Sequence, residues 1–151
     1  MIIRLANRTD KEWIIRHRLG LFHESGSSKE YLDETEILTR LFLDDDWTNH
    51  FNYYLAEDEN TVVGGYAMSV LVIIPFAGQP KGRMAYLWNM YVEPEYRSRG
   101  IGRALLKHAI SVCKTMQVGH ISLHTTKMGR ALYESEGFKT SNRLLQLVIP
   151  L

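Results

Sequence analysis

An apolar run over residues 85–92 is followed by Pro94 and then by two glycines, Gly100 and Gly102, which open a long helical pattern. This order predicts a buried strand that turns directly into a helix packed on its own sheet. The first turn of a helix presents unpaired N–H groups and about half a positive charge, and glycine lets an anion approach closely. The segment therefore predicts a seat for a phosphate group.

Three arginines surround this turn, at Arg97, Arg99 and Arg103. Their charge makes a diphosphate a better fit than a single carboxylate. Two known phosphate cradles do not match. A P-loop requires Gly-Lys-Ser/Thr where this chain has arginine and alanine at 103 and 104, and the dinucleotide fingerprint requires a third glycine where Leu105 stands.

The rest of the pattern predicts a mixed, mostly antiparallel α/β (α+β) sheet flanked by about four helices. Polar turns join the middle strands as antiparallel neighbours, whereas the strand after the long helix needs a crossover and pairs in parallel. Gly137 is expected as a left-handed helix cap. The expected elements are a strand at 2–5, a helix capped by Thr9 or Asp10, a helix at 29–43, strands at 51–57, 62–74 and 83–92, a helix at 101–116, a strand at 120–124, a helix at 127–136 and a closing strand at 144–149.

Length and composition limit the class of protein. A chain of 151 residues fits one domain, 1–151, and the single cysteine, Cys113, cannot form an internal disulfide. Cys113 lies on the apolar side of the long helix and is expected in the core. With no apolar leader after Met1 we expect a cytoplasmic protein. A net charge of +1 predicts no nucleic acid or membrane partner, and His120 and His124 lack a third ligand, so no metal is expected.

Two segments of the sequence resemble motifs of the GNAT superfamily of acetyl-CoA-dependent N-acetyltransferases. Residues 97–102, Arg-Ser-Arg-Gly-Ile-Gly, match the family's Gln/Arg-x-x-Gly-x-Gly/Ala motif, and residues 131–138 are similar to its Leu-Tyr-Glu-x-x-Gly-Phe segment. The resemblance implies a GNAT-like domain and acetyl-CoA as cosubstrate. It also implies that Tyr133 protonates the leaving thiolate.

The resemblance further implies which residues hold the cofactor. Backbone groups of Met90 and Val92 would hold the pantetheine and polarise the acetyl carbonyl, and Thr126 stands where the family often has a cofactor-binding asparagine. The implied cofactor-binding set is Met90, Tyr91, Val92, Arg97, Ser98, Arg99, Gly100, Ile101, Gly102, Arg103 and Thr126.

The acceptor side carries no motif. Asn89 interrupts an apolar strand and needs either a structural hydrogen bond or an acceptor contact, so it is the expected substrate-binding residue. The general base stays open among Glu24, Glu34, Glu36 and water. We expect direct transfer in a ternary complex to the amine of a small molecule or peptide. A non-catalytic acyl-CoA sensor is the alternative, a nucleic-acid-binding regulator is a weaker third, and a homodimeric assembly stays open.

Overall fold

The computed structural model describes residues 1–45, 51–141 and 146–149. Its centre is a five-stranded sheet in the order β1-β2-β3-β4-β5, antiparallel except for the parallel β4–β5 pair. The predicted mixed, mostly antiparallel sheet is confirmed. The strands are β1 (Ile2–Leu5), β2 (Asn52–Asp58), β3 (Thr61–Val72), β4 (Arg83–Val92) and β5 (His120–Leu123).

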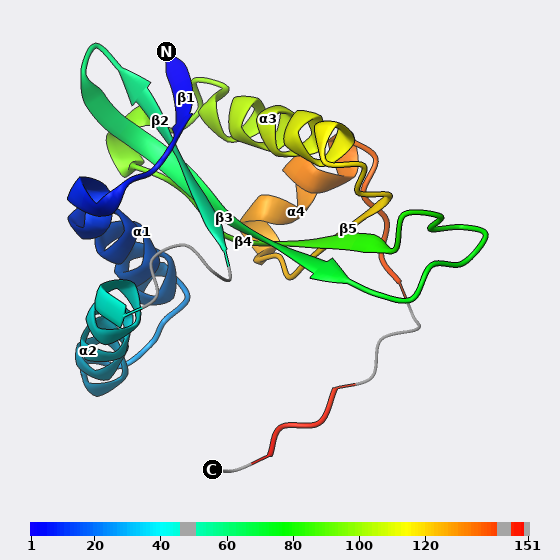
Figure 1. Ribbon diagram of the computed structural model, residues 1–151. Coiled ribbons are helices and arrows are strands. Elements are labelled where there is room, and N and C mark those ends of the chain that lie inside the picture. The colour runs from blue at the N-terminus through cyan, green and yellow to red at the C-terminus, as the bar shows by residue number, and fades with distance from the viewer. Residues whose placement is uncertain (46–50, 142–145, 150–151) are drawn as a thin grey trace.

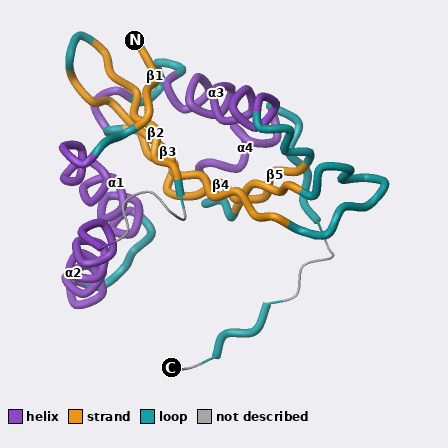
Figure 2. Tube along the Cα trace, viewed as in Figure 1, coloured by secondary structure: helices purple, strands orange, loops and turns teal. Residues whose placement is uncertain are grey.

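The helices form two layers. Helices α1 and α2 cover one face of the sheet, and α3 and α4 lie on the other (Figure 1). Figure 2 shows the same layers, with the strands between the two helix pairs. The four α-helices of the described ranges are α1 (Lys11–Glu24), α2 (Lys29–Asp45), α3 (Ile101–Thr115) and α4 (Lys127–Ser135), with short 3-10 helices η1 (Arg8–Asp10) and η2 (Pro94–Tyr96).

Each face of the sheet has its own apolar core. On the α3 side, Leu105, Leu106 and Ala109 pack fully buried against β3 and β4, as their helical spacing predicts. On the α1 side, Ile14 and Ile15 pack in a second cluster with residues of β2 and β3. The two cores hold the two helix pairs on opposite faces of the sheet. The central strands therefore lie between the two helix pairs.

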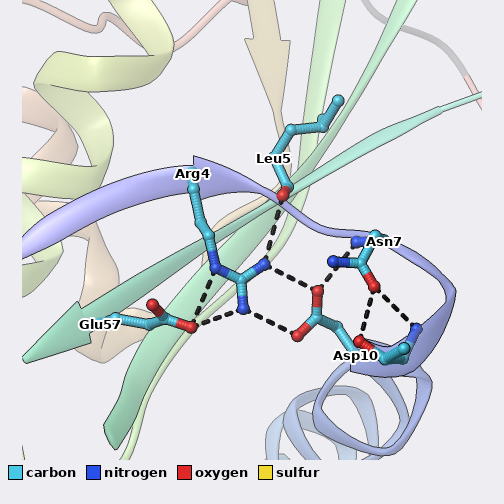
Figure 3. A network of polar contacts seen from close by, with 6 residues as sticks. Arg4, Leu5, Asn7, Asp10 and Glu57 are labelled. Atoms are coloured by element: carbon cyan, nitrogen blue, oxygen red, sulfur yellow. Dashed lines mark hydrogen bonds and ion pairs between the residues drawn. The ribbon is translucent and has the colours of Figure 1, made fainter. Parts of the chain in front are cut away.

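Asp10 is the N-cap residue of α1 and is one of the two predicted candidates, but its side chain makes no cap hydrogen bond there. Asn7 provides a side-chain cap one element earlier, for the 3-10 helix η1. Asp10 is instead turned toward Arg4, whose two Nη atoms lie 2.7 and 2.8 Å from its carboxylate (Figure 3). Arg4 also donates from Nε to Glu57 on β2, at 2.9 Å. This bidentate pair lowers the pKa of Asp10.

The predicted closing strand is wrong for residues 146–149, and residues 144 and 145 lie outside the described ranges. Gln146 to Ile149 form no strand, and Leu147 and Val148 are 84% and 87% exposed. A strand requires a neighbouring backbone, and apolar composition alone does not provide one. The side-chain amide of Gln146 lies 2.8 Å from Nε2 of His124, the residue that follows β5.

Candidate active site

The parallel pair β4–β5, at one edge of the sheet, separates before β4 ends. Pairing of β4 with β5 runs from Met84↔His120 to Leu87↔Leu123, whereas β4 continues to Val92. Within the described chain, residues 88–92 therefore have no strand beside them on the β5 side. Unpaired backbone N–H and C=O groups at such an edge accept an extended ligand in place of a strand.

A bulge lies in β4 where the pairing has ended. The register with β3 passes from Gly65↔Tyr91 to Ala67↔Trp88, so two β4 residues, Asn89 and Met90, oppose one. Asn89 carries the extra residue's strain with φ 55°, a left-handed conformation that asparagine tolerates better than most side chains.

The turn after η2 has the geometry of an anion seat. Ser98 and Gly100 both have positive φ, 60° and 80°, and α3 begins at the next residue, Ile101. Left-handed residues alternating with ordinary ones direct successive N–H groups into one concavity. A Cβ placed on Gly100 would meet nothing within 4 Å, so the space beside this turn is open.

The two motif glycines have different roles in the structure. A Cβ on Gly102 would lie 3.3 Å from Cδ2 of Leu132 on α4, so this glycine allows close packing of α3 against α4. Gly100 instead holds the left-handed turn before α3. The expected close approach of an anion therefore depends on Gly100 more than on Gly102.

The motif arginines are held by protein groups. Arg97 donates from Nε to the carbonyl of Val92 at 2.9 Å and from Nη2 to Glu24 at 2.6 Å, which ties the turn to the end of α1. Arg99 donates to a backbone carbonyl of η2, and Arg103 lies 3.4 Å from the carboxylate of Glu136. The positive charge of Arg97 is thus shared with a carboxylate before any ligand arrives.

The structure brings Tyr133 from α4 to the bulge of β4. Its Oη lies 3.5 Å from Sδ of Met90, and its ring packs edge-on against Phe138. Burial raises the pKa of Tyr133 to about 12, so the phenol is protonated at neutral pH. Thr126 caps α4 by accepting a hydrogen bond from the N–H of Gly129, so its hydroxyl already has a structural partner.

On the opposite face, a cavity of about 550 Å³ opens between α1, α2 and the strands. Asn89 lies on it and is 6% exposed. Its Oδ1 accepts from Arg18 at 3.4 Å, but its Nδ2 has no hydrogen-bond partner in the described chain. The Oδ1 of Asn89 thus has a structural hydrogen-bond partner, and its Nδ2 is left as a donor for a ligand. The lining residues are Ile14, Arg18, Tyr31, Glu34, Thr35, Leu38, Thr39, Phe42, Leu43, Phe51, Tyr53, Trp88 and Asn89.

A buried polar chain lies behind this cavity. The Tyr53 hydroxyl lies 3.1 Å from Nδ1 of His17, whose Nε2 lies 3.4 Å from Glu93. Arg16 closes the chain with two bonds to Glu93, at 2.7 and 2.8 Å. Burial, with a smaller effect from the Arg16 charge, lowers the pKa of His17 to about 3, so its imidazole is neutral at pH 7.

The three glutamates considered as general base lie in different surroundings. Glu24 pairs with Arg97 and accepts from the Tyr91 hydroxyl at 3.2 Å, and Glu36 pairs with Arg40 at 2.8 Å. Glu34 is the one of the three that lines the cavity.

The cysteine is where the sequence predicts it. Cys113 is 2% exposed, its Sγ lies 3.4 Å from Sδ of Met68, and burial raises its pKa to about 11. A thiol in this state is a weak nucleophile at neutral pH.

Sequence reasoning did not single out Arg18, although a signal was present. Arg18 follows the buried Ile14 by four residues, so it falls on the same face of α1. A cation on such a face predicts a buried or ligand-binding role.

Residues 1–45, 51–141 and 146–149 hold no group of three or more His, Cys, Asp or Glu side chains placed to bind a metal ion. They also hold no helix long and apolar enough to cross a membrane.

Comparison with known proteins matches residues 17–138 to the model of the acetyltransferase (GNAT) family. Among curated proteins, GCN5-related N-acetyltransferase 2, chloroplastic, of Arabidopsis thaliana is 31% identical over 55 residues. That match spans 36% of this chain and about a fifth (21%) of the relative.

Solved structures match almost the whole chain. A predicted acetyltransferase from Clostridium acetobutylicum, solved with acetyl-CoA, has a TM-score of 0.83 at 26% identity and covers 97% of this chain and 95% of its own. A GCN5-related N-acetyltransferase from Ralstonia eutropha has a TM-score of 0.84 at 25% identity, with 97% of each chain covered.

Proposed function

Because this chain belongs to the acetyltransferase (GNAT) family, we propose that it transfers the acetyl group of acetyl-CoA to a primary amine by direct transfer in a ternary complex. The observation that carries the proposal is the free edge of β4, with Tyr133 beside its bulge and the start of α3 just beyond its end. Tyr133, the free edge of β4 and the start of α3 follow one another in the order of the thioester, the pantetheine and the diphosphate of acetyl-CoA.

The residues fit that cosubstrate in two places. The left-handed turn at Ser98 and Gly100, with the first N–H groups of α3, suits the diphosphate. The unpaired edge at Met90 and Val92 suits the amides of pantetheine, which bind as a strand would. In this proposal Arg97 positions the turn through Glu24 and Val92, and Arg99 and Arg103 lie at its rim.

The chemistry requires one proton to leave the acceptor and one to reach the thiol. An amine with a pKa near ~10.4 is neutral in on the order of one molecule in a thousand at pH 7, so a base must take its proton. Glu34 or a water molecule serves here. The amine nitrogen bonds to the acetyl carbon as the carbon–sulfur bond breaks, and the Tyr133 hydroxyl stabilises the departing sulfur by donating a hydrogen bond to it. The thiolate then takes its proton from solvent.

Calorimetry with acetyl-CoA and thiol release with a panel of amines test the proposal. We expect one acetyl-CoA per chain and amine-dependent release of CoA. Binding without release for any amine in the panel would favour the acyl-CoA sensor, and failure to bind would overturn both.

A further inference from the structure

The wall of the cavity contains two neighbouring hydrogen-bond donors, Arg18 and Asn89, that an acceptor with an amine alone would not require. We propose that the acceptor is an α-amino acid with a large apolar side chain, and that Arg18 and Asn89 bind its carboxylate. The inference rests on the proposed acetyl transfer and names the acceptor class of that site.

Arg18 is a half-buried cation without a carboxylate in the described part of the chain. Its guanidinium lies over the rings of Phe22 and Trp88, 5.1 and 5.8 Å from their centroids, and donates to Oδ1 of Asn89 at 3.4 Å. A desolvated charge without a counter-ion is unfavourable, and burial lowers the pKa of Arg18 accordingly. An anion in the cavity would remove this cost. Other arginines pair with carboxylates: Arg4, Arg16, Arg40, Arg97, Arg103 and Arg130.

Asn89 supplies the second donor. Its side chain lines the same cavity, its Nδ2 has no partner there, and its Oδ1 is already in contact with Arg18. A carboxylate has two oxygens and can accept from both groups at once. Buried donors without acceptors are rare in proteins, so the Nδ2 of Asn89, beside a guanidinium that has no carboxylate partner in the described chain, points to a ligand oxygen.

The rest of the wall is suited to an apolar group. Aromatic side chains come from α2, β4 and the start of β2, and aliphatic ones from both helices. The volume of about 550 Å³ lies within the range of roughly 300 to 1,000 Å³ found for small-molecule sites. The lining side chains of this kind are Ile14, Tyr31, Leu38, Phe42, Leu43, Phe51, Tyr53 and Trp88.

The position of the reacting nitrogen favours an α-amine. In an amino acid this nitrogen lies only about 2.5 Å from the carboxyl carbon, as two single bonds dictate. A carboxylate held at Asn89 therefore keeps the amine beside the backbone of the β4 bulge, whose other residue, Met90, is contacted by Tyr133 from the opposite face. Polyamines and aminoglycosides bring no carboxylate and would leave Arg18 and Asn89 unsatisfied.

The test measures binding, so it does not depend on turnover. CoA-saturated protein is titrated by calorimetry with L-phenylalanine, L-phenylalaninamide and 2-phenylethylamine. We expect phenylalanine to bind about 10- to 150-fold more tightly than the other two, the range that one charge-assisted hydrogen bond provides. Arg18→Gln should remove this preference, and Arg8→Gln, at an exposed arginine of η1 that does not line the cavity, should keep it.

Asn89→Asp is a second variant, because aspartate also tolerates the left-handed bulge while its charge repels a carboxylate. It should weaken phenylalanine binding and leave phenylethylamine binding equal or stronger. Equal affinity for phenylalanine and its amide would point to peptide N-termini and overturn the inference, as would no binding of any of the three. Release of CoA with other amines would in that case leave the proposed transfer intact. Carboxylate-dependent binding without any acetyl transfer would support this site and refute the proposed activity.

Discussion

Replacing Tyr133 with phenylalanine removes one oxygen from the site and leaves the ring in place. In the structure this oxygen contacts Sδ of Met90 at 3.5 Å, a weak hydrogen bond whose loss costs less than about 1 kcal/mol of stability. The ring keeps its edge-on contact with Phe138. The free energy of unfolding and the affinity for acetyl-CoA should therefore change little.

The expected loss of rate follows from the pKa of Tyr133. At about 12 it lies roughly 3.5 units above that of a thiol near ~8.5, so complete proton transfer to a thiolate would cost about 5 kcal/mol. Tyr133 therefore acts mainly by a hydrogen bond to the sulfur as it becomes charged. Hydrogen bonds to charged groups contribute about 1.5–3 kcal/mol, which corresponds to a fall in turnover of roughly 10- to 150-fold.

Single-turnover thiol release with a verified acceptor measures this effect on the chemical step. The same pKa predicts that wild-type turnover shows no decline caused by Tyr133 below about pH 10. Tyr54→Phe is the matched control, since Tyr54 is half-buried on β2 and packs on Tyr66 away from α4. A Tyr133→Phe rate within twofold of wild type, with chemistry limiting, would refute the assignment and leave Tyr133 a packing role.

Three further perturbations test separate parts of the account. Gly100→Val should weaken acetyl-CoA binding at least about tenfold by calorimetry, whereas Gly26→Val, at another positive-φ glycine with open space around it, should lower stability only. Equal affinity of the two variants for acetyl-CoA would refute the proposed anion-binding turn at Ser98 and Gly100. Cys113→Ala should keep turnover and lose about 1–2 kcal/mol of stability, and mass spectrometry finding an acetyl group on Cys113 in the wild type would contradict direct transfer. His17 is neutral in the folded protein, with a pKa of about 3 against ~6.5 in the unfolded chain, so protonation favours the unfolded chain and the free energy of unfolding should decrease by about 2 kcal/mol from pH 7 to pH 5. In chemical denaturation, His17→Gln should lack this part of the pH dependence, and an unchanged pH dependence in the variant would contradict the burial argument.

Features with a local physical cause could be predicted from the sequence. The turn into α3 follows from Pro94 and Gly100, the helix from its buried stripe, and the parallel strand from the need for a crossover. The left-handed cap at Gly137, with φ 93°, is confirmed for the same reason. The turn, the helix and the cap depend on neighbouring residues alone, and the parallel pairing follows from the connection between its two strands.

Features that depend on distant partners could not be predicted. Nothing near Arg97 indicates that Glu24, 73 residues away, shares its charge, and nothing near Asn89 indicates the bulge or the cavity that this residue lines. The prediction of a closing strand was wrong for the same reason, because the apolar composition of residues 146–149 gives a propensity for β structure but provides no neighbouring strand.

Acetyl-CoA labelled with ¹³C in its acetyl group tests the central claim most directly. The protein is incubated with the labelled acetyl-CoA in the presence and in the absence of a panel of primary amines. The masses of the amines and of the intact chain are then measured by mass spectrometry. The account predicts label on an amine nitrogen whenever an accepted amine is present, and no label on the chain in its absence. Label on the chain alone, or intact acetyl-CoA with every amine tested, would contradict it.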